Sequence, residues 1–218
     1  MEHNIALYCM ARSGSTSLFD CVSEHLGKNY LKIWEPFNPN PDNQLFMKDA
    51  DSYKKLFEGI NGNQKIFLKL MMGQKNPWVK QTTWDRYVFE KIPKIVFLTR
   101  EDKKAAAESL LANQLDGEAS FHTKKYYDVS SLDKIELEMR ILANELHDKF
   151  MKIYSREFGY PIFTYEEIYI EKRMDRINQI FEYLEIEPKI ELINKWLISD
   201  EYKVKLGNIE DKPKNKIL

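Results

Sequence analysis

Cysteine is scarce in this chain of 218 residues, which contains only Cys9 and Cys21. Their spacing is not that of a metal site, and no cluster of Asp, Glu or His with ligand spacing accompanies them. We therefore expect two buried free thiols and no bound metal. Free thiols fit a reducing compartment, so a cytoplasmic location is expected.

Long apolar runs are also missing. No stretch of 18 apolar residues occurs, so no transmembrane helix is expected. Residues 1–4 lack the basic start of a secretion signal, and the apolar run after them is short. The formal net charge is only −1, which gives no bulk attraction to nucleic acid or to an anionic membrane. A site for an anion must therefore be built locally.

The composition that remains is typical of a soluble globular protein. Apolar residues make up 43% and charged residues 31%, which is enough apolar material for one sizeable core. No internal repeat, low-complexity stretch or linker divides the chain. We predict a single domain over residues 1–218.

Short apolar runs predict buried strands, and stretches between them have helical spacing. The predicted strands are Ile5–Met10, Tyr30–Trp34, Ile66–Leu70, Ile95–Leu98 and Pro161–Tyr165. Helices are predicted for the apolar positions from Leu18 to Leu26, around Tyr53–Phe57, around Ala105–Ala107, from Ile135 to Ile153, from Ile177 to Leu184, and at Leu192–Leu197. This alternation predicts an α/β fold of three layers, α/β/α, with a central parallel sheet. Ligands of such sheets bind at the carboxyl ends of the strands.

The first strand runs into Arg12-Ser13-Gly14-Ser15-Thr16 at the start of a helix. Backbone N–H groups at such a start favour a bound anion, and Gly14 lets the backbone approach a phosphate. An ordinary helix N-cap with nothing bound explains the loop equally well. A nucleotide-kinase loop has a lysine directly after its last glycine, and none follows Gly14, which argues against hydrolysis of ATP or GTP.

A second candidate lies after the strand Ile95–Leu98. Arg100 is at the carboxyl end of that strand, and Ser109 is placed two to three turns along the next helix. The two side chains together would grip a phosphate, with the arginine as a bidentate fork. The alternative is an arginine paired with Glu101 or Asp102.

Both stretches resemble motifs of the sulfotransferases that use 3′-phosphoadenosine 5′-phosphosulfate (PAPS). Residues 9–18, CMARSGSTSL, resemble the 5′-phosphosulfate-binding loop in the R-S-G-S-T form of carbohydrate and bacterial members. Residues 95–110, IVFLTREDKKAAAESL, resemble the 3′-phosphate motif. Residues 163–168, FTYEEI, resemble the late strand that ends in Y-E-[DE]-[LIM]. The three motifs occur in the family's order, which makes the set more specific than each motif alone.

The resemblance implies a P-loop NTPase-like sulfotransferase fold with PAPS as co-substrate and a small-molecule or carbohydrate acceptor. It implies that Arg100 and Ser109 hold the 3′-phosphate and that Tyr165 lies against the adenine. The 5′-phosphosulfate would be held by Arg12, Ser13, Gly14, Ser15, Thr16 and Ser17.

The chain departs from the cytosolic members in three respects. Arg100 and Ser109 are nine residues apart, one more than usual, which puts Ser109 in doubt. Ser17 replaces a tryptophan that would stack on adenine. The glycine-containing basic motif near the C-terminus is absent, and so is the short dimer motif. The oligomeric state therefore stays open.

Sulfuryl transfer needs a base for the acceptor proton and positive charge at the leaving phosphate, by analogy with phosphoryl transfer. Glu35 closes the second strand beside the loop and is similar to the Glu of a Glu-Pro pair in several carbohydrate sulfotransferases, so we predict it as general base. A solvated or helix-capping carboxylate is the alternative. Arg12 is placed for the leaving group, and Lys69, a charge inside an apolar strand, points to the site or pairs with Glu35.

His122 is the rival base, because it is in a loop near the expected site. The other three histidines (His3, His25 and His147) are interpreted as surface residues. Two other functions stay open: a P-loop kinase or nucleotide hydrolase, and a non-catalytic relative that binds the nucleotide without turnover. The identity of the acceptor is not readable from the sequence.

Overall fold

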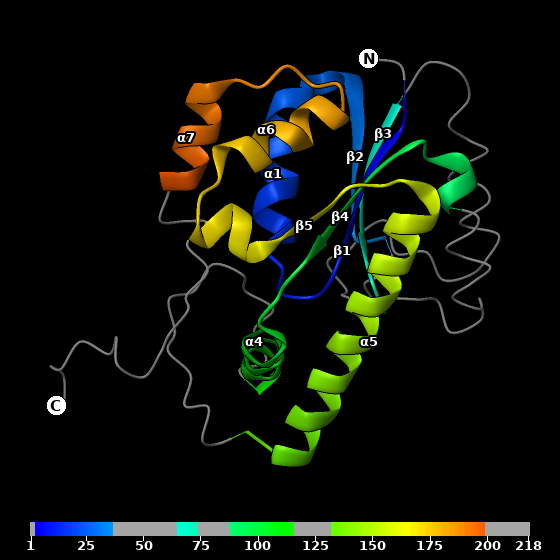
Figure 1. Ribbon diagram of the computed structural model, residues 1–218. Coiled ribbons are helices and arrows are strands. Elements are labelled where there is room, and N and C mark those ends of the chain that lie inside the picture. The colour runs from blue at the N-terminus through cyan, green and yellow to red at the C-terminus, as the bar shows by residue number, and fades with distance from the viewer. Residues whose placement is uncertain (1–2, 37–64, 74–87, 116–131, 199–218) are drawn as a thin grey trace, which may run out of the picture.

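The computed structural model describes residues 3–36, 65–73, 88–115 and 132–198. Its sheet has five parallel strands in the order β2-β3-β1-β4-β5 (Figure 1). The strands are β1 (Ile5–Cys9), β2 (Tyr30–Trp34), β3 (Lys65–Met71), β4 (Lys94–Thr99) and β5 (Ile162–Thr164). All five predicted strands are thus confirmed, and so is the parallel sheet.

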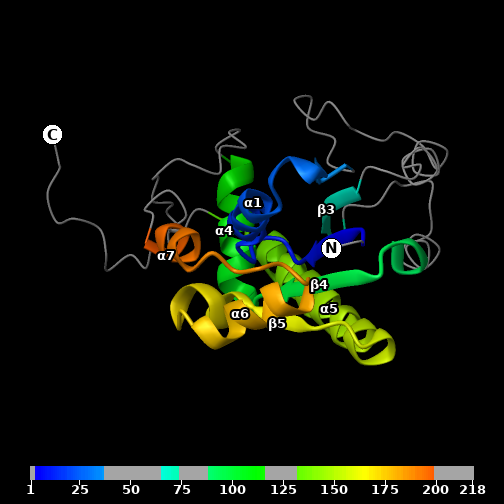
Figure 2. The ribbon, with the colours of Figure 1, turned by 90° about the horizontal axis from the view of Figure 1, so that it is seen from above.

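The helices also agree with the predicted pattern. They are α1 (Ser15–Leu26), α4 (Lys103–Leu115), α5 (Lys134–Phe158), α6 (Met174–Tyr183) and α7 (Ile190–Ile198), with a π-helical turn at Glu166–Ile170 directly after β5. The helix expected around Tyr53–Phe57 lies outside the described residues. Crossover helices between parallel strands produce three layers, as Figure 2 shows with α1 and α5 on opposite sides of the sheet.

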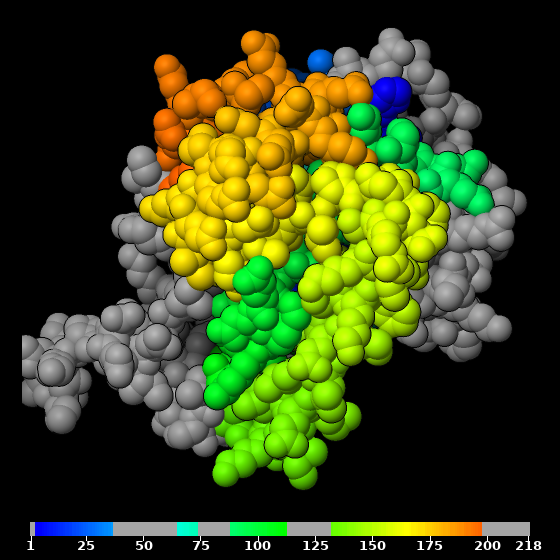
Figure 3. All heavy atoms as spheres, in the orientation of Figure 1, coloured from blue at the N-terminus to red at the C-terminus, as the bar shows by residue number. Residues whose placement is uncertain are grey.

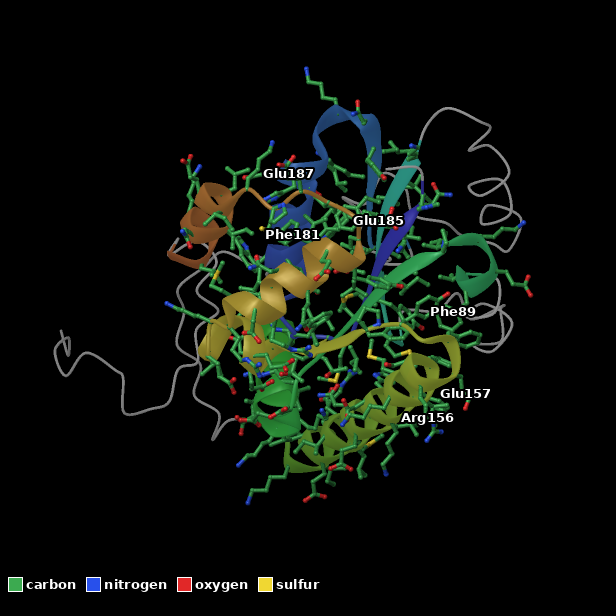
Figure 4. The ribbon with its side chains drawn as sticks, turned by 45° about the horizontal axis from the view of Figure 1, so that its top comes forward. Phe89, Arg156, Glu157, Phe181, Glu185 and Glu187 are labelled. Carbon is green, nitrogen blue, oxygen red and sulfur yellow. The ribbon has the colours of Figure 1, made fainter. Side chains whose placement is uncertain are left out.

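Alternate residues of β1 separate the core into two halves, because successive side chains of a strand point to opposite faces. Ile5, Leu7 and Cys9 belong to the apolar cluster that includes α1, α6 and α7. Figure 4 shows Phe181 of α6 in this layer, where its ring contacts that of His25 of α1 at 4.5 Å. Ala6, Tyr8 and Met10 pack in the other cluster, which includes Met151 of α5.

The strands end together at one edge of the sheet, and this edge positions the site. Cys9 of β1 pairs with Met71 of β3 and Leu98 of β4, while Thr99 pairs with Thr164 of β5. The loop before α1, the residues after β2 and β3, and the starts of α4 and of the π-helical turn therefore meet there. In Figure 1 this is the lower edge of the sheet.

The long helix α5 differs from the expectation in one respect. Its predicted apolar positions lie on one face, but that face is turned away from the sheet and is exposed. The buried face carries Asn144, Asp148 and Met151 instead. Asp148 Oδ1 lies 3.2 Å from Lys103 Nζ of α4, and Asn144 donates to the Lys103 carbonyl at 3.3 Å. Polar contacts with α4 therefore decide which face of α5 is buried. The apolar periodicity alone would predict that the other face packs against the sheet.

The two cysteines are free and buried, as expected. Burial raises the pKa of each thiol to about 12, so both stay protonated at neutral pH. Within the described part of the chain, no helix is long and apolar enough to cross a membrane. Over the same residues, no group of three or more His, Cys, Asp or Glu side chains is gathered as metal ligands would be.

Candidate functional site

The loop between β1 and α1 is shaped by Gly14 and Tyr169. Gly14 has a φ of 75°, a left-handed conformation that side chains disfavour. The Tyr169 hydroxyl donates to the Gly14 carbonyl at 2.6 Å, and a Cβ on Gly14 would lie 2.3 Å from the Tyr169 ring. Ser13 adds a second anchor, because its hydroxyl donates to the Met10 carbonyl at 2.7 Å. Only glycine fits at this turn.

The start of α1 lacks the side-chain cap that the starts of α4 and α5 have. Asp102 accepts from Ala105 N at 2.8 Å at the start of α4, and Asp133 accepts from Glu136 N at 2.8 Å at the start of α5. Gly14 has no side chain with which to cap α1. The first N–H groups of this helix therefore carry the positive end of the helix dipole without a local carboxylate.

Lys69 is a buried charge at the centre of the edge. Its side chain is 1% exposed, and its Nζ lies 2.7 Å from Glu35 Oε1. Lys69 also donates to Thr16 Oγ1 at 2.8 Å and lies 4.8 Å from the centroid of the Trp34 ring. A desolvated lysine needs such partners. The pairing with Glu35 agrees with the expectation from sequence, and the contact with Thr16 ties both residues to the loop.

Two residues assigned to chemistry have a left-handed backbone although they are not glycine. Arg12 has a φ of 60° and Glu35 a φ of 41°. Glu35 directly follows β2, and Arg12 comes three residues after the end of β1, both at the site edge. Such conformations cost on the order of 1–3 kcal/mol and persist only where surrounding contacts impose them. Lys172 and Glu185 also have positive φ away from this edge, so the strain supports the site without defining it.

Arg100, Arg12 and Ser109 form one connected group. Arg12 Nε donates to Ser109 Oγ at 2.8 Å, and Arg100 Nη1 donates to the Arg12 carbonyl at 3.1 Å. The nine-residue spacing therefore does not keep Ser109 from the other two. The Arg12 side chain, predicted for the leaving group, is directed to Ser109 instead, and Lys69 is the cation that contacts the start of α1.

Arg100 itself is 1% exposed, and its Nε has no hydrogen-bond partner among the residues that the structure describes. The carboxylate near it is Glu166, at 4.0 Å, and not Glu101 or Asp102. Glu166 is engaged elsewhere, because it accepts hydrogen bonds from the backbone N–H groups of Glu101 (2.9 Å) and Asp102 (3.2 Å). A buried guanidinium with an unmatched N–H is costly unless an acceptor approaches it.

Tyr165 is packed beside Arg100 because Thr99 and Thr164, the residues before them, are paired in the sheet. The Arg100 guanidinium lies 4.6 Å from the Tyr165 ring centroid, and the Tyr169 ring stacks on Tyr165 at 4.9 Å. The side chain of Tyr165 is 3% exposed. These contacts make Tyr165 a support for Arg100, while its contact with adenine stays a prediction.

The structure also brings in residues that the sequence reasoning missed. Glu166 lies within the motif at residues 163–168, and Tyr169 directly follows it. The spacing of four residues between Tyr165 and Tyr169, which puts both on one face of a helical turn, was the signal that could have found Tyr169. His147 of α5, interpreted as a surface residue, packs against Gly73 after β3, where a Cβ would lie 2.9 Å from its ring. His25 is half-buried, with Nδ1 2.7 Å from the Cys21 carbonyl oxygen. The rival base His122 lies outside the described residues.

Comparison with known proteins identifies the fold. Neither protein-family models nor curated protein sequences match the chain. Among solved structures, it is similar to mouse sulfotransferase SULT7A1 complexed with PAP, with a TM-score of 0.55 and 14% identity over 90% of this chain and 63% of that chain. It is also similar to retinol dehydratase in complex with androsterone and inactive cofactor PAP, with a TM-score of 0.46 and 14% identity over 88% of this chain and 63% of that one. The chain therefore spans less than two thirds of the length of either protein.

The first of these likenesses confirms the predicted fold class. It covers 90% of this chain, whereas 14% identity is too low to transfer an activity or residue roles by itself. This chain therefore shares its α/β/α fold with a solved sulfotransferase structure.

Proposed function

We propose that this chain is a sulfotransferase that moves the sulfuryl group of PAPS to a hydroxyl or amine of a small-molecule or carbohydrate acceptor and releases PAP. The observation that carries the proposal is the buried Arg100, with an unmatched Nε and with Arg12 and Ser109 beside it. A phosphate oxygen supplies the acceptor that this group lacks. The fold shared with a PAP-bound sulfotransferase supports the same ligand.

The two phosphate-bearing ends of PAPS fit two separate features of the edge. The open start of α1 suits the 5′-phosphosulfate, since backbone N–H groups and the hydroxyls of Ser15 and Thr16 meet there. The Arg100 group suits the 3′-phosphate. Because the Arg100 side chain bonds the Arg12 backbone, the two features share one loop, and an adenosine with phosphates on both sides would bridge them.

The reaction would be an in-line transfer. The acceptor oxygen gives its proton to the Glu35 carboxylate and forms a bond to sulfur, while the bond from sulfur to the bridging oxygen of the 5′-phosphate breaks. That oxygen keeps the electron pair, and the leaving phosphate gains negative charge. Lys69 would offset this charge, and its contacts with Thr16 at the start of α1 and with Glu35 support that role.

The experiment is transfer of labelled sulfate from PAPS to a panel of phenols, sugars and lipid-like alcohols and amines. PAP formation that depends on an acceptor, and a labelled product, would support the proposal. A protein that binds PAP but releases no labelled product with any acceptor would be the non-catalytic relative. Equal binding of ATP and PAP would instead favour the kinase alternative.

A further inference from the structure

The carboxylate of Glu166 lies at the start of α4. Its Oε2 accepts a hydrogen bond from Glu101 N at 2.9 Å, and its Oε1 accepts one from Asp102 N at 3.2 Å. These two residues directly precede Lys103, the first residue of α4, where the helix dipole favours a negative charge. Both hydrogen bonds are exposed, and Figure 3 shows α4 (green) beside the segment after β5 (yellow) at the surface. The chain thus places an anion of its own at this helix start.

Arg100 adds a donor that Glu166 does not satisfy. Arg100 is 1% exposed, and its Nε lies 4.0 Å from Glu166 Oε1, which is too far for a hydrogen bond. Other parts of the guanidinium are engaged, because Nη1 donates to the Arg12 carbonyl at 3.1 Å and the Tyr165 ring centroid lies 4.6 Å away. The Nε has no hydrogen-bond partner among the described residues. A buried donor is therefore left over beside the Glu166 carboxylate.

A phosphate suits these three donors better than a carboxylate does. The two oxygens of Glu166 are both used by the backbone N–H groups of Glu101 and Asp102. A phosphate monoester has three terminal oxygens, so it can accept from both N–H groups and from Arg100 Nε at once. A helix start alone does not define an anion site, but the buried and unmatched Arg100 beside this one points to a ligand.

We propose that Glu166 occupies part of the 3′-phosphate site in the free chain and that the 3′-phosphate of PAPS or PAP displaces it. Because it identifies the ligand of Arg100 as the 3′-phosphate, this proposal rests on the proposed function. The displaced carboxylate turns into solvent. The Glu166 side chain is already 15% exposed, and its ion-pair partner among the described residues is Arg100 at 4.0 Å, so few contacts are lost.

The exchange gives the carboxylate a role in each state of the site. In the free chain Glu166 offsets part of the buried charge of Arg100 and satisfies the start of α4. In the complex the phosphate does both. The two anions repel each other at this separation, so the contact of Glu166 and the binding of the 3′-phosphate exclude one another. Glu166 therefore lowers the affinity for the 3′-phosphate.

The first test is calorimetric titration with PAP and with AMP, which differ only in the 3′-phosphate. The wild-type chain should bind PAP more tightly. Glu166→Gln and Glu166→Ala should each raise the ratio of the PAP affinity to the AMP affinity about tenfold or more, because the competing carboxylate is gone. Glu167→Gln is the matched control and should leave the ratio unchanged. Glu167 lies on the same turn and accepts from Thr164 N at 2.9 Å, but it pairs with Arg176 at 2.8 Å.

Thermal unfolding separates this role from a merely structural one. Without nucleotide, Glu166→Ala should melt below the wild-type protein, because the N–H groups of Glu101 and Asp102 lose their acceptor. Saturating PAP should then raise the melting temperature more in the variant than in the wild-type protein, and saturating AMP should not. A crystal structure of the PAP complex should show phosphate oxygens within hydrogen-bond distance of both N–H groups, with Glu166 turned outward.

An affinity ratio that stays the same or falls in both Glu166 variants would overturn the proposal. A fall would make Glu166 a positioning residue for the turn that carries Arg100. A PAP complex in which Glu166 still accepts from both N–H groups would also overturn it. A wild-type chain that binds PAP and AMP equally would have a different meaning, because it would refute the assignment of Arg100 to the 3′-phosphate and the proposed function with it.

Discussion

The Tyr169 hydroxyl holds the carbonyl of Gly14 at 2.6 Å, across 155 positions of sequence. Tyr169 lies on the π-helical turn after β5, and Gly14 lies in the loop after β1. This hydrogen bond therefore links the residues assigned to the 5′-phosphosulfate with the motif that supports Arg100. Burial raises the pKa of Tyr169 well above its usual value, so the hydroxyl keeps its proton and stays a donor.

Gly14→Ala should be strongly destabilising. The new Cβ would lie 2.3 Å from the Tyr169 ring, and the left-handed backbone would add its own strain, together about 2–5 kcal/mol. Gly159→Ala is the matched control: Gly159 has a φ of 70°, and nothing lies within 4 Å of a Cβ there. That variant should lose about 1–2 kcal/mol only. Denaturant unfolding of the two variants measures the difference. Equal losses of stability would mean that the Tyr169 ring moves aside from the new Cβ at no cost in free energy.

Tyr169→Phe should keep the ring packing but lose the hydrogen bond to Gly14. We expect a loss of about 1 kcal/mol in stability. The affinity for PAP should also fall, since the loop would lose the hydrogen bond that holds the Gly14 carbonyl. Calorimetric titration with PAP measures the second effect. The control is Tyr183→Phe, on α6 outside the site. Unchanged PAP affinity in Tyr169→Phe would show that Gly14 is positioned by its own backbone alone.

Arg100→Ala should abolish the preference for PAP over ATP. Loss of a charge-assisted hydrogen bond costs about 1.5–3 kcal/mol, or roughly ten- to a hundredfold in affinity. PAP should raise the melting temperature of the wild-type protein by mass action, and ATP should do so far less because it lacks a 3′-phosphate. Thermal unfolding with each nucleotide makes the comparison, with Arg140→Ala on α5 as control. Equal shifts in melting temperature with PAP and with ATP in the wild-type protein would refute the assignment of Arg100 to the 3′-phosphate.

Sequence reasoning predicted the strands and helices of the described residues, and the edge of the sheet where the candidate residues meet, because each depends on local pattern. The apolar runs end at Arg12, Glu35 and Arg100, and parallel strands bring such ends to one edge. It did not reach the direction of the Arg12 side chain, which a partner 97 positions away decides. The outward face of α5 was missed for a similar reason, because Asp148 and Asn144 bind Lys103 of another helix.

Activity should persist in excess chelator. Buried Lys69 and Arg100 supply positive charge at the edge, which is the role that a metal ion has in phosphoryl transfer. Turnover with and without EDTA tests this, and the matched control is a metal-dependent kinase assayed in the same buffer. Loss of activity in chelator, followed by recovery on adding magnesium, would point to a kinase-like mechanism.

Substitutions at Glu35 and Lys69 should affect stability and turnover to different degrees. Lys69→Met removes the cation that lies 2.7 Å from the carboxylate of the 4% exposed Glu35, so we expect a loss of about 3–5 kcal/mol in stability. Glu35→Gln/Lys69→Met removes both charges and should recover much of that loss. Glu35→Gln alone should lower turnover by about 10²–10⁴-fold, as expected when a general base is removed.

The same variants distinguish the two candidate bases. Turnover of Glu35→Gln and His122→Ala is compared under saturating donor, with PAP affinity measured in parallel, because neither residue is assigned a phosphate contact. The double variant Glu35→Gln/Lys69→Met should be folded and inactive, with weaker binding of PAP than Glu35→Gln, because Lys69 is assigned to offset the charge of the 5′-phosphate. A near wild-type rate in Glu35→Gln, with collapse only in His122→Ala, would transfer the role of base to His122. Lys69 would then act through Thr16 and the leaving group rather than through Glu35.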